Sequence, residues 1–302
     1  MTAVPNSSVP GPVVWAGGGE LGIAWETGLA AGLLDEGVDL RRASLTVGTS
    51  AGSVVGAALM AGMDLRESAD ALAFPASDSA LIPGGVDPAA LRDAFAQLIS
   101  NWMSGNMGGS TLAEVGAMAL EASPIQENAF VDLIAARLTM GDEFPERLAV
   151  TTVDTADGEF VVYDSGSGAP LKRVIAASCS VPGLFPPVTV GDRRLMDGGA
   201  RSVTNADVAL RAEPAPALVV TLLPGIAPPG TLFDTWETAL KNEVSQLEEA
   251  SFPTHILRAS PDDLNAIGPN PMDSSRNPQS AEAGRIRGRA EAALPAYDSW
   301  RI

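Results

Sequence analysis

A serine lies in a pattern that could support nucleophilic chemistry. Residues 48–52 read GTSAG, so Ser50 stands between Gly48 and Gly52 in the pattern G-x-S-x-G. An apolar run precedes it, and a segment rich in Ala, Val and Gly follows. This order is typical of a nucleophile elbow, in which a tight strand-to-helix turn exposes the serine hydroxyl and small neighbours admit the substrate. Serine is also a favoured helix N-cap, so the pattern alone leaves both interpretations open.

A glycine loop occurs about thirty residues earlier. Gly17, Gly18 and Gly19 follow a short apolar run, and together with Gly22 they fit the dinucleotide-binding pattern G-x-G-x-x-G. That pattern requires an acidic residue at the end of the second strand, but the acidic residues here, within 35–39, precede that strand. We therefore interpret the loop as a source of backbone N–H donors for an oxyanion, at a helix N-terminus whose dipole favours negative charge.

A candidate base follows much later in the chain. Asp197 comes directly after the short segment RRLM, and two glycines after it leave room for a partner to approach. Asp-Gly is also an ordinary turn signal, so Asp197 taken alone is better explained by a structural role in a turn.

The single histidine and the single cysteine restrict the chemistry. His255 alone cannot form the usual multi-histidine zinc site, and Cys179 alone cannot form an intramolecular disulfide. A Ser-Asp-His triad has the chain order of an α/β-hydrolase, but the residue before the glycine loop is Ala16, where such enzymes usually carry a histidine. We therefore expect His255 to be structural.

Charge and hydropathy narrow the class of partner and the location. The chain has 19 basic and 37 acidic residues and a net charge of −18, which disfavours nucleic acid and anionic membrane surfaces. No Lys or Arg precedes Arg41, so the charged region of a secretory signal is missing. The longest near-continuous apolar stretch, 54–63, falls well short of the roughly 20 residues that span a bilayer. We expect a soluble, cytoplasmic protein.

Strands and helices alternate along most of the chain. This order predicts an α/β fold with a mostly parallel sheet covered on both faces. The expected strands are 13–16, 45–47, 148–153, 160–163 and 217–222, and the expected helices are 21–34, 51–60, 130–138 and 236–249.

The same alternation of strands and helices predicts one domain over 1–302. Its motif-bearing core is 12–205, and 206–302 completes the sheet and helices. Residues 75–124 interrupt the alternation with helical patches around a Gly-rich hinge, and we expect them to form an inserted helical cap over the site. The Pro- and Ser-rich piece 269–280 is expected to be a surface loop.

Four ordered motifs together carry a family resemblance. They are the glycine loop, GTSAG, the stretch ASCSVPGLFPP at 177–187 and Asp197-Gly198-Gly199. In this order they resemble the patatin-like phospholipases, over about 13–204. The resemblance implies a three-layer α/β/α fold in which a Ser-Asp dyad hydrolyses lipid acyl esters without metal or cofactor. Ser50 would be the nucleophile, Asp197 the base, and Gly17, Gly18 and Gly19 the oxyanion hole.

One residue departs from the family pattern. The family usually has Arg or Lys two positions after the glycine triplet, and this chain has Leu21. The loss of that charge favours neutral or lysolipid esters over phospholipids. The expected partner is therefore a lipid or other acyl ester, with transient contact to a membrane or lipid aggregate. Two alternatives remain open: the α/β-hydrolase triad, and a non-catalytic lipid-binding protein that keeps the fold.

Overall fold

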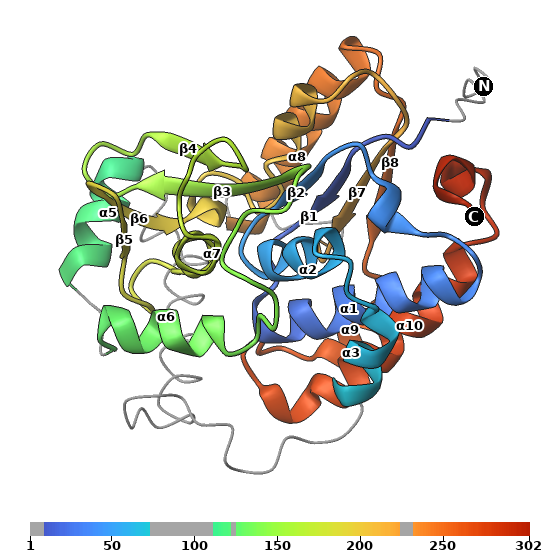
Figure 1. Ribbon diagram of the computed structural model, residues 1–302, viewed down its shortest axis with the longest axis horizontal. Coiled ribbons are helices and arrows are strands. Elements are labelled where there is room, and N and C mark those ends of the chain that lie inside the picture. The colour runs from blue at the N-terminus through green and yellow to red at the C-terminus, as the bar shows by residue number, and fades with distance from the viewer. Residues whose placement is uncertain (1–8, 73–110, 122–124, 224–231) are drawn as a thin grey trace.

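The computed structural model describes residues 9–72, 111–121, 125–223 and 232–302, and it has a central sheet between layers of helices (Figure 1). The strand order is β5-β6-β3-β2-β1-β7-β8, and β4 pairs with the remaining side of β3 along part of its length. The parallel strands are β1 (Val13–Trp15), β2 (Thr46–Gly48), β3 (Leu148–Asp154), β7 (Ala217–Thr221) and β8 (Thr254–Arg258). The antiparallel strands are β4 (Phe160–Tyr163), β5 (Val188–Val190) and β6 (Arg193–Asp197). The predicted α/β fold with a mostly parallel sheet is confirmed.

The two faces of the sheet bury alternate residues of each strand. On β1, Val13 and Trp15 pack with the cluster that contains α1 residues, whereas Val14 packs with the cluster that contains α8 residues. Successive side chains of a strand point to opposite faces, so every residue of a strand that is covered on both faces is buried. This explains why β1, β2, β3 and β7 are buried along their whole length.

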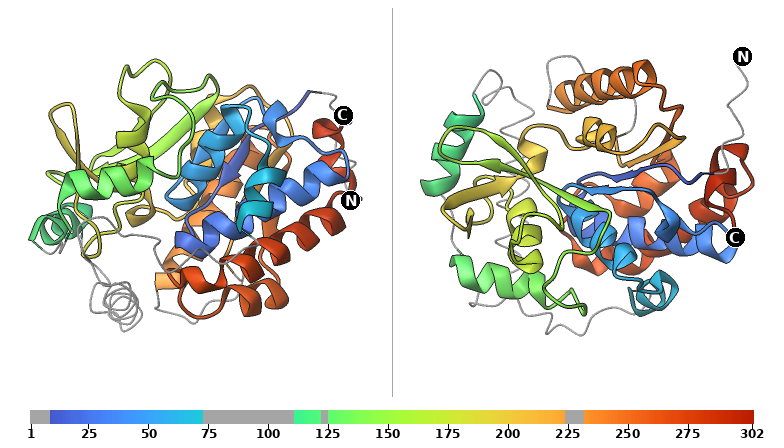
Figure 2. Two further views of the ribbon diagram at one scale, coloured as in Figure 1. Left: turned by 60° about the horizontal axis from the view of Figure 1, so that its bottom comes forward. Right: turned by 45° about the horizontal axis from the view of Figure 1, so that its top comes forward.

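The helices divide between these faces (Figure 2). One face carries α1 (Gly19–Asp35), α2 (Ala51–Met60), α3 (Leu65–Leu72), α6 (Glu127–Ala135), α7 (Leu171–Ser178), α9 (Pro261–Ile267) and α10 (Asn277–Glu291). The opposite face carries α5 (Leu112–Glu121) and α8 (Leu232–Glu249). Among the described residues, no helix is both long enough and apolar enough to cross a membrane.

Helices α1 and α10 touch backbone to backbone. A Cβ atom added at Gly28 would lie 1.9 Å from the carbonyl oxygen of Ala281, and one added at Gly284 would lie 2.0 Å from that of Trp25. Only glycine permits such an approach at these positions. Arg285 of α10 also pairs with Asp35 at the end of α1, at 2.9 Å. These contacts hold α1, whose first turn begins in the glycine loop.

Several elements were not predicted from the sequence. They are β5, β6, α3, α7, α9 and α10, all short or lacking a clear apolar period. The expectation that 269–280 is a surface loop was wrong in part, because α10 begins at Asn277 and Pro269, Pro271 and Met272 line the pocket described below.

The predicted cap lies largely outside the described residues, which exclude 73–110 and 122–124. Its described part is α5, which packs on the sheet. A Cβ atom at Gly116 of α5 would lie 2.3 Å from the carbonyl oxygen of Thr155, just after β3, and no α5 residue lines the pocket.

Candidate active site

Ser50 lies in a sharp, strained turn between β2 and α2. Its φ of 53° and ψ of −120° lie in a region that residues with a Cβ atom rarely adopt. Its hydroxyl makes no capping bond to α2. The backbone supports the turn instead: the Ser50 N–H donates to Ser178 Oγ at 2.9 Å, and Ser53 Oγ donates to the Ser50 carbonyl at 2.6 Å. The hydroxyl is therefore not used as a helix cap.

The glycines that flank Ser50 allow this turn. A Cβ atom at Gly52 would lie 2.1 Å from the carbonyl oxygen of Trp15, and one at Gly48 would lie 2.5 Å from the Cα of Ser53. Both separations are shorter than the distances at which a Cβ atom contacts a non-bonded atom, so a side chain at either position would force the turn open.

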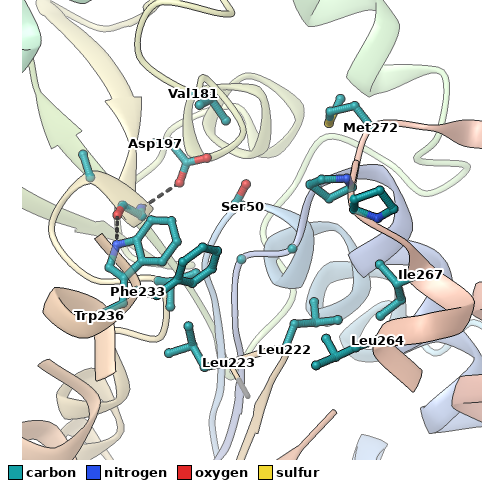
Figure 3. Close-up of a pocket in the computed structure, with 18 of the residues that line it drawn as sticks. Ser50, Val181, Asp197, Leu222, Leu223, Phe233, Trp236, Leu264, Ile267 and Met272 are labelled. Carbon is teal, nitrogen blue, oxygen red and sulfur yellow. Dashed lines mark hydrogen bonds between the residues drawn. The ribbon is translucent and has the colours of Figure 1, made fainter. Parts of the chain in front are cut away.

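Asp197 ends β6 and faces the same pocket as Ser50 (Figure 3). The residue is 4% exposed, and its Oδ1 accepts a hydrogen bond from the N–H of Gly199 at 2.7 Å. Burial raises the pKa of the Asp197 carboxyl to about 7, against the opposing effects of the Gly199 N–H and the Ser50 hydroxyl. A carboxyl with this pKa can exchange a proton near neutral pH.

The glycine loop lies beside Ser50 because β1 and β2 are neighbouring parallel strands. Gly17, Gly18 and Gly19 all line the pocket. The N–H of Gly17 donates to the carbonyl of Val203 at 2.8 Å, so it is already used. In the described parts of the chain, the N–H groups of Gly18 and Gly19 have no acceptor. The candidate oxyanion donors are thus Gly18 and Gly19, rather than all three glycines.

Gly17 has a different use. A Cβ atom there would lie 3.1 Å from Cγ2 of Val203 and 3.4 Å from Cβ of Ser50. The missing side chain therefore leaves open the space directly beside the serine.

The pocket is an apolar cavity of about 250 Å³. Figure 3 shows its walls around Ser50, with Leu222 and Leu223 at the end of β7, Trp236 on α8 and Met272 after α9. Asp197 is the one ionisable side chain among the described residues that line it. The other apolar lining residues are Val181, Pro182, Ala200, Val203, Phe233, Leu264, Ile267, Pro269 and Pro271. Such a cavity favours an acyl chain and offers no cation to an anionic group.

Three residues considered from the sequence lie away from this pocket. Leu21 is fully buried in the core beside α10, and its N–H donates to the carbonyl of Pro271 at 2.8 Å. His255 lies on β8, with its ring edge-on to Tyr297 at 5.4 Å between centroids and its Nε2 3.7 Å from Glu291. Cys179 is buried, with Sγ 3.9 Å from Ser53 Oγ. None of the three lines the pocket.

The sequence did not indicate most of the pocket wall. The i, i+3 spacing of Phe233 and Trp236 is a helix signal that could equally describe core packing. Met272 and its neighbouring prolines lie in a segment whose composition is typical of a surface loop. Segment 202–206, which contains Val203, carries no motif that sequence reasoning would select.

The fold and the site define an α/β protein in which a serine on a strained turn faces a buried aspartate beside a glycine loop. The sequence model of the family described as Patatin-like phospholipase matches residues 13–210. The chain belongs to this family, and the resemblance stated from the four motifs is confirmed.

Curated relatives include uncharacterized NTE family proteins of Mycobacterium tuberculosis strain H37Rv and of Mycobacterium bovis. Each is 26% identical over 270 residues, which cover 84% of this chain and 40% of the relative. The chain thus spans about 40% of the length of these relatives. Similar solved structures include the type III effector protein ExoU, with a TM-score of 0.38, 20% identity and coverage of 93% of this chain and 53% of that one. VipD from Legionella pneumophila has a TM-score of 0.35 and 15% identity, and the match covers 63% of this chain and 46% of that one.

Proposed function

We propose that this chain is a serine acyl hydrolase that cleaves carboxylic esters of lipids through a Ser50–Asp197 dyad. The observation that carries the proposal is the arrangement of these two residues. Ser50 presents an uncapped hydroxyl on a strained turn, and Asp197 faces the same apolar pocket with a pKa of about 7. Membership of the patatin-like phospholipase family supports a lipid hydrolase in general terms.

The proposed reaction has two steps. As the Ser50 oxygen bonds to the ester carbonyl carbon, its proton passes to the Asp197 carboxylate. The negative charge on the carbonyl oxygen is stabilised by the N–H groups of Gly18 and Gly19, with the dipole of α1 behind them. The carbon–oxygen bond to the alcohol then breaks, and the alcohol leaves with the proton from Asp197. Water repeats the sequence on the acyl-enzyme and releases a carboxylic acid.

The geometry favours a dyad over a triad. His255, the single histidine, packs against Tyr297 and Glu291 and does not line the pocket. A triad would need an imidazole within hydrogen-bond reach of Ser50.

The pocket also favours neutral esters. A phosphate close to the ester would meet the Asp197 carboxylate and no described lining cation, so its desolvation would be uncompensated. Leu21 is turned into the core, and it therefore supplies nothing in place of the family's basic residue.

The test is a series of p-nitrophenyl esters from C4 to C16, followed by a monoacylglycerol and a lysophospholipid with the same acyl chain. We expect turnover that Ser50→Ala lowers by about a thousandfold, and at least about a tenfold preference in kcat/KM for the monoacylglycerol. Equal turnover by Ser50→Ala would remove Ser50 as the nucleophile, and no turnover of any ester would favour the non-catalytic alternative. A preference for the lysophospholipid would contradict the assignment of a neutral substrate.

A further inference from the structure

One buried amide touches both sides of the candidate site. Asn205 is fully buried, and its Nδ2 lies 3.1 Å from Thr49 Oγ1 and 3.1 Å from the carbonyl oxygen of Gly198. Thr49 directly precedes Ser50, and Gly198 directly follows Asp197. A single side chain thus bridges the turn that carries the serine and the turn that carries the aspartate.

The orientation of this amide is fixed from the other side. Arg201, which has only donors, contributes a hydrogen bond to Asn205 Oδ1 at 2.8 Å. The NH₂ group must therefore face the four remaining oxygens. Besides Thr49 and Gly198, these are the Ser202 carbonyl at 2.6 Å and Thr151 Oγ1 at 3.4 Å.

The backbone of Asn205 suits this position. Its φ of 47° and ψ of 42° are in the left-handed region, which asparagine tolerates better than most residues with a side chain. The hydroxyls of Thr49 and Thr151 lie 2.7 Å apart and are both buried, so they extend the amide's contact to β3, the strand with which both β2 and β6 pair.

The same segment, 202–206, also contacts the glycine loop and α8. The carbonyl of Val203 accepts the Gly17 N–H at 2.8 Å, directly before the two free N–H donors. Buried Glu243 of α8 accepts hydrogen bonds from Thr204 Oγ1 at 2.7 Å and from the Ala206 N–H at 2.8 Å. Segment 202–206 is thus bonded to α8 through Glu243, and it also contacts the Ser50 turn, the Asp197 turn and the glycine loop.

We infer that Asn205 is a positioning residue, which holds the Ser50 turn and the Asp197 turn at the separation that proton transfer requires. The inference rests on the proposed function. Asn205 does not line the pocket, so it acts through Thr49 and Gly198 and not on the substrate. A displacement of about 1 Å between reacting groups typically costs about a hundredfold in rate, so the loss of this bridge should appear in kcat.

The test compares Asn205→Gly with Thr155→Val. Glycine keeps the left-handed backbone and deletes the amide. Thr155 is a matched control, because its buried hydroxyl donates to the Arg194 carbonyl at 2.9 Å and it does not line the pocket. We expect both variants to fold, with the larger loss of thermal stability in Asn205→Gly, because the Asn205 side chain makes more hydrogen bonds than the Thr155 hydroxyl. Only Asn205→Gly should lose about 30- to 100-fold in kcat, with KM within about threefold and an equal fall in the rate of fluorophosphonate labelling at Ser50.

Asn205→Asp serves if the glycine variant does not fold. It keeps the side-chain size and the bond from Arg201 but offers no N–H to Thr49 or Gly198, so the same losses are expected. A kcat within threefold of the wild type in either folded variant overturns the inference, as does an unchanged labelling rate. Failure of the wild-type protein to turn over any ester or to react at Ser50 is a different result: it removes the proposed function itself, and this inference with it.

Discussion

Ser50 and Asp197 are brought together by β2 and β6, two strands that pair with the same edge of β3. Gly48, the last residue of β2, pairs with Val150 in the parallel ladder between β2 and β3, and Ser50 follows two residues later in the turn. Asp197 pairs with Thr152 in the antiparallel ladder between β3 and β6. Two strands that run in opposite directions thus end close to each other along one edge of β3, and this arrangement underlies the predictions that follow.

The first prediction concerns pH. Asp197 must be a carboxylate to accept the Ser50 proton, and burial raises the pKa of Asp197 to about 7. We therefore expect kcat/KM for a p-nitrophenyl ester to be constant well above pH 7 and to fall about tenfold per pH unit well below it. Initial rates from pH 5 to 9 measure this, with melting curves at each pH as the control. An acidic limb centred near pH 4 would show that the base is an ordinary exposed carboxyl.

The second prediction concerns stability at the same residue. The pKa of Asp197 is higher in the folded chain, about 7, than the usual 3.8 expected on unfolding. The contribution of Asp197 to the free energy of unfolding is therefore most favourable below pH 4. It falls by up to about 4 kcal/mol as the pH rises towards and through 7. Asp197→Asn removes this cost, so it should melt above the wild type at pH 8, by a margin that shrinks towards pH 4. Thermal denaturation at both pH values tests this, and a constant difference would contradict it.

The third prediction concerns the strained turn. The Ser50 backbone, at φ 53° and ψ −120°, is easy for glycine and costly for other residues by about 1–3 kcal/mol. Ser50→Gly should therefore unfold at a higher urea concentration than Ser50→Ala, although both lack the hydroxyl. The free energy of unfolding of Ser50→Gly should exceed that of Ser50→Ala by only about 1 kcal/mol, because glycine also gains entropy on unfolding. If Ser50→Ala proves the more stable of the two, the turn is not strained.

The main parallel strands and the four ordered motifs could be recognised in the sequence because their signals are local. The apolar runs of β1, β2 and β7 indicate buried strands, and the glycines around Ser50 indicate a tight turn. Both features can be recognised from residues that are adjacent in the sequence. β6 was not predictable, since an antiparallel strand of five residues with two arginines resembles a loop. Asn205 was not predictable either, because its role depends on Thr49 and Gly198, which only the folded chain brings to it.

The fourth prediction separates a dyad from a triad. His255 lies against Tyr297 and Glu291, so we expect it to take no part in proton transfer. His255→Ala should keep at least about a tenth of the wild-type kcat/KM, a loss below about 1.4 kcal/mol in the barrier. The measurement is steady-state kinetics beside thermal melting. A variant that melts like the wild type but falls to the activity of Ser50→Ala would require a triad.

The most direct test of the central claim is covalent labelling of Ser50 with a fluorophosphonate, followed by mass spectrometry of the modified peptide. We predict one label per wild-type chain, located on Ser50, and none on Ser50→Ala. Labelling of Asp197→Asn should be slower by about a hundredfold or more, since the neutral amide cannot accept the serine proton. A label on another residue, or an Asp197→Asn variant that reacts at the wild-type rate, would contradict the Ser50–Asp197 dyad.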